Sequence, residues 1–206
     1  MMKLSAVEFR PPRIETERLI LRGYESGDTA DIYEYASDVE TTRFVAWERA
    51  TAPEDIDAFL NSVVAPNYEH QELDYAMTLR GKEDRCIGGV ALYWRPREHH
   101  VMELGYVLHR GYWGQGLVAE AGRALIAHAF ATTSVERVFA PIFAGNGGSR
   151  RVAEKLGMQL DGVLRSHLVV RGQRQDVAIY SLLRADLMGG GDGGGGARHT
   201  VLSATR

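Results

Sequence analysis

The chain has 206 residues, of which 45% are hydrophobic and 25% are charged, a composition typical of one globular domain with a well-buried core. Its formal net charge of -3 gives no general attraction to nucleic acid or to an anionic membrane, so we expect neither as a partner. No apolar run approaches the length that spans a bilayer. Cys86 is the single cysteine, which excludes an internal disulfide framework and indicates a cytoplasmic protein.

The first third of the chain predicts one strand and two helices. The apolar run at 17–22 is typical of a strand. Ser26 or Asp28 is suited to cap the helix that follows, and Thr51 with Glu54 forms the pattern of a capping box for a second helix.

The remaining two thirds predict six strands and two helices. A strand meander is expected at 73–80, 86–93 and 101–108, then a helix from 117, a strand at 137–142, a helix at 149–156, and strands near 159–170 and 174–184. This order predicts an α/β fold with a central mixed sheet of about six to seven strands and helices on both faces. We expect one domain at 14–187, an N-terminal arm at 1–13 and a disordered glycine-rich tail at 188–206.

The segment from 103 to 121 carries the strongest functional pattern, because a short apolar strand meets a glycine-rich turn that opens into an alanine-rich helix. Gly111, Gly114 and Gly116 can adopt positive φ and let backbone N–H groups approach a ligand. The unpaired N–H groups at the start of the helix point to the same place. The turn therefore predicts a phosphate-binding site.

Spacing separates two uses of such a turn. A dinucleotide site needs G-x-G-x-x-G and an acidic residue at the end of the next strand, whereas this turn has G-x-x-G-x-G and Glu136 would begin that strand. A nicotinamide cofactor is therefore disfavoured. A glycine turn before a helix is also common as a simple connection, and spacing alone leaves that alternative open.

Four motifs that follow one another along the chain favour a ligand-binding turn over a simple connection. They are TERLILR from Thr16, ELGY from Glu103, YWGQG from Tyr112 with Glu-Ala at 120–121, and N-x-x-S from Asn146. Together they resemble the GCN5-related N-acetyltransferases (GNAT), and specifically the RimJ/RimL-like branch, over residues 14–187. The resemblance implies acetyl-CoA as co-substrate. It also implies that the strand at 101–108 carries a bulge and splays from the next strand, and it makes a homodimer plausible.

The same resemblance implies which residues hold acetyl-CoA. The end of the strand at 101–108 is expected to pair with pantetheine as an extra strand would, and the indole of Trp113 to wedge the loop against the core. Asn146 is expected to bond the pantetheine arm, although ending a turn is its simpler role. The basic residues at 150, 151 and 155 are more typical of a solvated helix face. The candidate residues are Tyr106, Val107, Leu108, Trp113, Gly114, Gln115, Gly116, Leu117, Val118, Asn146 and Ser149.

Glu103 is the candidate catalytic base, because acyl transfer needs a group that deprotonates the amine. Its apolar neighbours favour a raised pKa by desolvation; the alternative is a strand glutamate paired with an arginine. His99, His100 and His109 are alternative bases, although each lies in or beside a predicted loop. No histidine pair has metal-ligand spacing, so we predict no metal.

Ser149 is the candidate hydrogen-bond donor to the departing thiolate. Many members of the superfamily resemble a pattern with a tyrosine in this role, but that position is Ala153 here, so the resemblance transfers the role to the serine of its branch. A first-turn position in a helix is the alternative reason for a serine. Trp47 and Trp94 are candidate acceptor-binding residues. Cys86 lies in an apolar run, which favours a buried strand position over a covalent acyl carrier.

The expected acceptor is a primary amine. An α-amine has a pKa of about 8 and a lysine amine of about 10.4, so a single carboxylate base suits the α-amine, and members of the branch resemble enzymes that acetylate ribosomal protein N-termini. We therefore predict an acetyl-CoA-dependent acetyltransferase of protein N-terminal α-amines that works by direct attack in a ternary complex. The alternatives are a small-molecule acceptor such as an amino acid, polyamine or aminoglycoside, a longer acyl chain, or a non-catalytic acyl-CoA-binding module.

Overall fold

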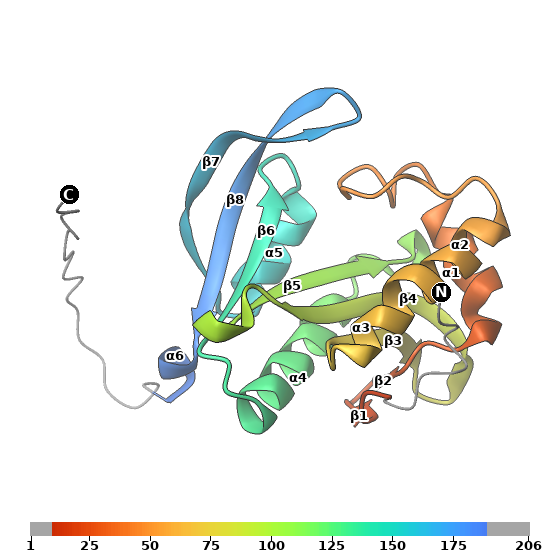
Figure 1. Ribbon diagram of the computed structural model, residues 1–206, viewed down its shortest axis with the longest axis horizontal. Coiled ribbons are helices and arrows are strands. Elements are labelled where there is room, and N and C mark those ends of the chain that lie inside the picture. Colours follow the sequence, from red (N-terminus) through yellow and green to blue (C-terminus); the bar gives the residue numbers. More distant parts are fainter. Residues whose placement is uncertain (1–9, 189–206) are drawn as a thin grey trace, which may run out of the picture.

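The computed structural model describes residues 10–188 (Figure 1). Most of the predicted N-terminal arm and nearly all of the predicted glycine-rich tail therefore lie outside the described residues. Within the described part, no helix is both long and apolar enough to cross a membrane. No cluster of three or more His, Cys, Asp or Glu side chains in 10–188 has an arrangement that could hold a metal ion.

A mixed sheet of eight strands forms the centre of the described chain, in the order β1-β2-β3-β4-β5-β6-β8-β7. All neighbours are antiparallel except β5 and β6. The predicted mixed α/β sheet is confirmed, and its extra strand is β1, whose two residues pair back onto β2 and are too few to leave a periodic pattern. The strands are β1 Ile14–Glu15, β2 Leu19–Arg22, β3 Leu73–Leu79, β4 Lys82–Trp94, β5 Val101–Leu108, β6 Arg137–Phe143, β7 Gln159–Val170 and β8 Gln173–Leu183.

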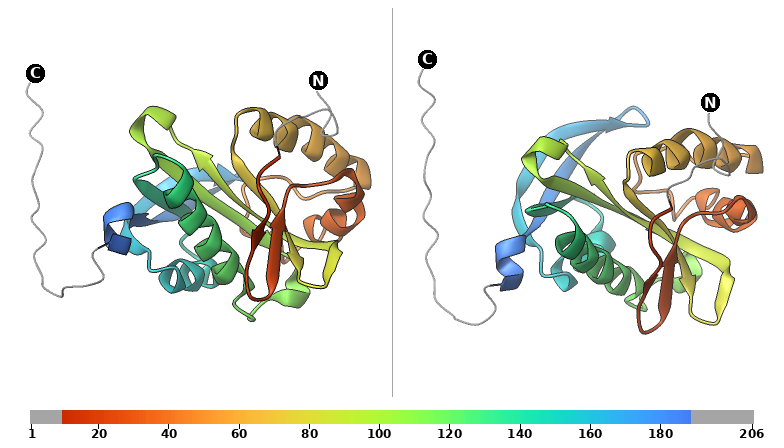
Figure 2. Two further views of the ribbon diagram at one scale, coloured as in Figure 1. Left: turned by 90° about the horizontal axis from the view of Figure 1, so that it is seen from below. Right: turned by 60° about the horizontal axis from the view of Figure 1, so that its bottom comes forward.

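Helices cover both faces of the sheet, as Figures 1 and 2 show. Alternation along β3 explains the two layers, because Tyr75 and Met77 pack into the core beneath α4 while Ala76 packs beneath α1 to α3. A π-helical turn at Leu60–Val64 joins α2 to α3, so the predicted second helix continues to Glu69. The helices are α1 Thr29–Ala36, α2 Pro53–Phe59, α3 Ala65–Glu69, α4 Leu117–Thr132, α5 Gly147–Lys155 and α6 Arg184–Met188.

Two predicted helix caps are wrong. The Asp28 carboxylate does not cap α1, because Arg22 Nη2 donates to its Oδ1 at 2.6 Å and Glu25 N donates to its Oδ2. At α2, the acid that turns back to the helix start is Asp55 and not Glu54. Its Oδ2 accepts from Thr51 N at 2.8 Å, because Asp55 is the third helical residue and is the one that reaches the preceding backbone.

The strands β5 and β6 separate after a short pairing. The two strands pair only at Val101↔Arg137, Met102↔Val138 and Glu103↔Phe139, while β5 continues to residue 108 (Figure 1). The predicted splay is confirmed. The predicted bulge is wrong, because β5 stays in register with β4 along their whole pairing from residue 102 to 108. The opening therefore arises because β6 diverges together with β8, to which it is paired along its full length.

Candidate active site

The glycine-rich turn between β5 and α4 has the predicted left-handed backbone at two of its three glycines. Gly114 has φ of 76° and Gly116 has φ of 78°, whereas Gly111 is in a 3-10 turn with negative φ. Trp113 is 47% exposed, so the predicted core wedge is wrong. Its indole N–H instead donates to the carbonyl of Leu108 at 2.8 Å, which ties the turn to the end of β5.

Glu120 joins the first and third sequence motifs. Its Oε1 accepts from Thr16 Oγ1 at 2.6 Å and from Arg18 N at 2.8 Å, and Arg18 Nη1 also donates to the carbonyl of Gln115. Burial would raise the pKa of Glu120, but the hydrogen bonds from Thr16 and Arg18 outweigh burial and lower it. The carboxylate is therefore ionised near neutral pH and holds the turn in place.

A cavity of about 500 Å³ lies beside this turn, between the starts of α4 and α5. The N-terminus of the 16-residue α4 offers unpaired N–H groups and positive potential. Two basic side chains from α5, which the sequence pattern alone assigns to a solvated face, add cationic groups. The residues that line this cavity include Tyr106, Val107, Leu108, Trp113, Gly114, Gly116, Leu117, Val118, Asn146, Ser149, Arg151 and Lys155. The predicted cofactor-binding residue Gln115 is not among the lining residues. This donor set fits a phosphorylated ligand.

Asn146 and Ser149 begin α5 at the inner end of this cavity. Asn146 Oδ1 accepts from Ser149 N at 3.1 Å, which is the N-cap bond of the helix. Tyr106 Oη donates to the Ser149 carbonyl at 3.2 Å, and burial raises the pKa of Tyr106 to about 12. A side-chain hydrogen bond from Ser149 opposes that rise in the pKa of Tyr106, and Ser149 lines both cavities.

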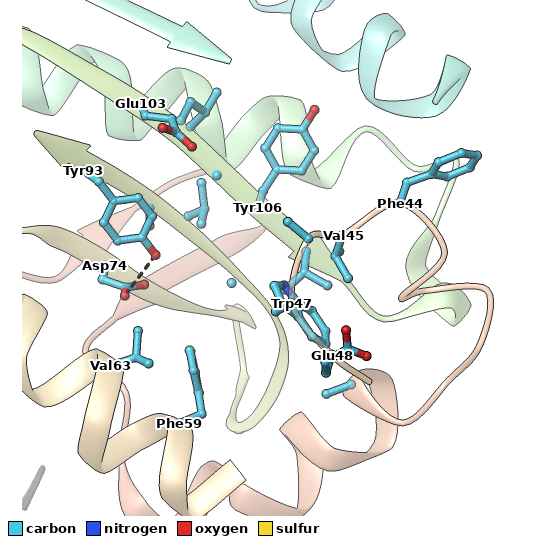
Figure 3. Close-up of a pocket in the computed structure, with 18 of the residues that line it drawn as sticks. Phe44, Val45, Trp47, Glu48, Phe59, Val63, Asp74, Tyr93, Glu103 and Tyr106 are labelled. Atoms are coloured by element: carbon cyan, nitrogen blue, oxygen red, sulfur yellow. Dashed lines mark hydrogen bonds between the residues drawn. The ribbon is translucent and has the colours of Figure 1, made fainter. Parts of the chain in front are cut away.

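A second cavity of about 1020 Å³ lies between the sheet and α1 to α3 (Figure 3). Gly89, Ala91 and Gly105 contribute to its lining, and the Tyr24 hydroxyl occupies the space that a Cβ at Gly89 would need. It shares with the first cavity the side chains Phe44, Val45, Tyr106, Val107, Asn146 and Ser149. The two cavities thus meet at the opening between β5 and β6.

Glu103 lies at the edge of this opening and lines the larger cavity. It is the last β5 residue that pairs with β6, and its side chain is 28% exposed. Arg95 Nε donates to its Oε2 at 3.1 Å. The sequence left two alternatives for this glutamate, a base and a partner of arginine, and its geometry is compatible with both roles.

Of the two predicted acceptor-binding tryptophans, Trp47 lines the larger cavity and Trp94 does not. Because side chains alternate along a strand, the neighbour Tyr93 faces the cavity, and Trp94 packs on the other side against the Arg97 guanidinium at 5.0 Å. The corrected aromatic residue of β4 is therefore Tyr93.

The three candidate histidine bases do not line either cavity. His100 lies 2.8 Å from the hydroxyl of Ser134. His109 Nδ1 accepts from Gly111 N at 3.0 Å. His99 lies in the short helical turn between β4 and β5. Cys86 is confirmed as a buried strand residue, and burial raises the pKa of its thiol to about 12, which disfavours a thiolate carrier.

Sequence reasoning missed Asp74, which lines the larger cavity from β3. Its Oδ2 accepts from Tyr93 Oη at 3.2 Å (Figure 3). The same oxygen also accepts from Asn67 Nδ2 at 3.0 Å. Burial raises the pKa of this carboxyl to about 6. The available signal was a carboxylate inside the otherwise apolar strand LDYAMTL, since such a residue is rarely buried without a reason.

Arg171 was also missed, and it holds the segment that carries Trp47. It lies in the turn between β7 and β8, far along the chain from that segment. Its Nη2 donates to the carbonyls of Thr42 at 3.2 Å and Trp47 at 3.0 Å. The β7–β8 turn thereby fixes one wall of the larger cavity.

The chain matches the family model described as an acetyltransferase (GNAT) domain over residues 18–159. It is 27% identical to the "Uncharacterized N-acetyltransferase YoaA" of Bacillus subtilis, across 84% of this chain and 97% of the relative. It is 25% identical to the "[Ribosomal protein uS5]-alanine N-acetyltransferase" of Escherichia coli, across 84% of this chain and 92% of the relative.

A solved structure agrees with these matches. The GNAT-family acetyltransferase from Bacillus anthracis superposes with a TM-score of 0.74 and 26% identity, covering 84% of this chain and 98% of that one. The fold of this chain is therefore that of a known family of acetyltransferases.

Proposed function

Because the chain belongs to the GNAT acetyltransferase family, to which residues 18–159 match, we propose that it transfers an acetyl group from acetyl-CoA to the N-terminal α-amine of a protein. The observation that carries the proposal is the meeting of two cavities at the β5–β6 opening. One cavity has a phosphate-binding turn and the other has a carboxylate at its edge. Donor and acceptor can thus reach the opening from two different cavities.

The smaller cavity suits the donor. The backbone N–H groups around Gly114 and Gly116 and the start of α4 would hold the pyrophosphate of acetyl-CoA, and Arg151 and Lys155 would add cationic contacts. Beyond Glu103, the edge of β5 that faces β6 has no strand partner among residues 10–188. Its N–H and C=O groups are available to the amides of pantetheine, as in the addition of a strand.

Two side chains near the opening suit the proton transfers. Glu103 would accept the proton that the attacking amine loses, either directly or through water. Ser149 Oγ would donate a hydrogen bond to the sulfur that leaves as CoA. Both lie on rigid elements, one at the end of a strand pairing and the other in the first turn of a capped helix, which favours direct transfer in a ternary complex.

The α-amine is favoured because its pKa of about 8 allows a modest carboxylate base to act near neutral pH. The name of the Escherichia coli relative, an alanine N-acetyltransferase of ribosomal protein uS5, supports an acceptor of this kind. A protein acceptor of ribosomal type would place the reaction in the cytoplasm.

The test is CoA thiol release against matched acceptors: N-terminal peptides, lysine peptides with blocked N-termini, amino acids, polyamines and aminoglycosides. We expect the highest kcat/KM for the N-terminal peptides. Higher kcat/KM with small amines would replace the protein acceptor by a small molecule. Binding of acetyl-CoA without release in any mixture would indicate a non-catalytic acyl-CoA-binding module.

A further inference from the structure

Asp74 is a buried carboxylate that faces the larger cavity without a cationic partner. The residue is 2% exposed, and both of its hydrogen bonds, from Tyr93 and Asn67, go to Oδ2. No Lys, Arg or His among residues 10–188 forms an ion pair with it, and no hydrogen bond to its Oδ1 is found in that range. Glu72, whose charge also raises the pKa of Asp74, has the same sign.

Such an arrangement is costly for the protein alone. A buried carboxylate is usually paired with a cation or fully hydrogen-bonded, because burial removes its hydration. Two neutral donors to one oxygen compensate only part of that cost. A positively charged ligand group at Oδ1 would compensate the rest.

The surroundings of Asp74 also suit a cation. Figure 3 shows Tyr93, Trp47 and Phe59 around the same space as Asp74, and all of them line the cavity. Aromatic faces attract a desolvated cation. Among the charged side chains that line this cavity, the acids Glu48, Asp55, Glu72, Asp74 and Glu103 outnumber the bases Arg49 and Arg95.

Asp74 and Glu103 occupy separate places in this cavity. Asp74 pairs with Ala91, which pairs with Gly105, two residues along β5 from Glu103. Two strand spacings and two residues place their Cα atoms roughly 12 Å apart, and Tyr93 stands between them, directly opposite Glu103 in the register. One acceptor molecule can therefore contact both carboxylates with two different groups.

We propose that Asp74 binds a second positively charged group of the acceptor while the amine to be acetylated lies beside Glu103. A carboxylate that pairs with an ammonium group keeps that group protonated, so Asp74 is suited to the group that does not react. The acceptor class is thus a primary amine with a second cation several bonds away, such as a peptide with a basic second residue. This inference rests on the proposed acetyl transfer and specifies its acceptor.

The test compares acceptors that differ only in the second charge. N-terminal peptides with lysine or norleucine at the second position form one pair, and 1,5-diaminopentane and pentylamine form another. For the wild type we expect kcat/KM at least tenfold higher with the charged member of a pair. Asp74→Asn, which keeps an acceptor for Tyr93 and Asn67, should reduce this ratio to about 1 to 3, mainly through KM of the amine, and leave KM of acetyl-CoA unchanged.

Asp84→Asn is the matched control, because Asp84 is exposed on β4 and should leave the ratio as in the wild type. An equal loss by Asp74→Asn with both members of each pair, or an unchanged ratio, would overturn the proposal. Calorimetric binding of the diamine and the monoamine separates this question from turnover. If no acceptor is acetylated, the proposed reaction fails, while stronger diamine binding that is lost in Asp74→Asn still supports the cation site, and equal binding of both amines contradicts it.

Discussion

Glu103 and Phe139 form the last pair between β5 and β6 before the strands separate. The candidate base is therefore fixed by strand pairing on one side and borders the opening on the other. Its ion pair with Arg95 joins side chains that are 28% and 49% exposed, and a pair of such exposure contributes little to stability. The carboxylate can exchange this partner for the amine of an acceptor at low cost.

Replacing Glu103 tests its role in proton transfer. Glu103→Gln keeps the size of the side chain and removes the base, so kcat should fall by about 10²- to 10⁴-fold, with KM of acetyl-CoA unchanged. Steady-state kinetics measure both constants. Arg95→Ala is the control for the ion pair and should change kcat by only a few fold. A wild-type kcat in Glu103→Gln would contradict the role of Glu103 as a base and would leave it only a structural role as the partner of Arg95.

Ser149→Ala tests the hydrogen bond to the leaving thiolate. The N-cap bond of α5 goes to the backbone N of residue 149, so the variant keeps the cap and should lose less than about 1 kcal/mol of stability. We expect kcat to fall by about tenfold or more, because a donor to the leaving group is lost. The experiment measures kcat and the midpoint of urea unfolding for both the wild type and Ser149→Ala. An unchanged kcat would assign Ser149 to helix structure alone.

Gly116→Ala tests the backbone of the phosphate-binding turn. The residue has φ of 78°, and a Cβ there would meet nothing nearer than Arg18 Nη2 at 3.9 Å. The change should therefore cost about 1–2 kcal/mol through backbone strain alone and weaken acetyl-CoA binding, as calorimetry would measure. Gly27→Ala is the control, because that glycine lacks a positive φ and has open space around its Cβ position. Equal acetyl-CoA affinity in both variants would contradict a role for this conformation.

Asp74→Asn should stabilise the protein in a pH-dependent way. Burial is the main cause that raises the pKa of Asp74 from 3.8 to about 6, so the folded state holds a proton that the unfolded state releases between these pH values. Stability contributed by this group is present below about pH 4 and is lost as pH rises through 6, at a cost of about 1–3 kcal/mol. Three buried tyrosines near Asp74 stay neutral over this pH range, because burial raises their pKa values. They are Tyr24, Tyr35 and Tyr93.

Urea unfolding at pH 4 and pH 7.5 measures this effect. The free energy of unfolding of Asp74→Asn should exceed that of the wild type at pH 7.5, and the difference should shrink at pH 4. Glu72, the other carboxylate near Asp74, titrates in both proteins and cancels in the comparison. A variant that is less stable by the same amount at both pH values would contradict the unpaired state of Asp74.

The sequence predicted the features that depend on neighbouring residues. The glycine-rich turn, the strand before it and the N-x-x-S helix start each lie within one segment, and the structure contains all three. The caps at Asp28 and Glu54 failed because Arg22 binds the first acid and Asp55, one residue later, reaches the backbone in place of the second. A local sequence pattern does not show which of two adjacent acids accepts the hydrogen bond from the backbone at the helix start.

The acceptor side of the site depends on contacts between distant segments. Trp94 was predicted to contact the acceptor, but a one-residue change in strand phase moves a side chain to the opposite face, and its neighbour Tyr93 lines the cavity instead. Asp74 is on β3 and its partner Tyr93 is on β4, while Arg171 holds the segment of Trp47 from 124 residues away. Register and tertiary packing place these groups together, and neither is written in one stretch of sequence.

Mass spectrometry of an N-terminal peptide after incubation with acetyl-CoA and the wild-type protein tests the central claim most directly. The account predicts one added acetyl group on the α-nitrogen, formed only when acetyl-CoA and the protein are both present. Acetyl-CoA that binds the protein while no peptide or small amine gains an acetyl group would contradict it.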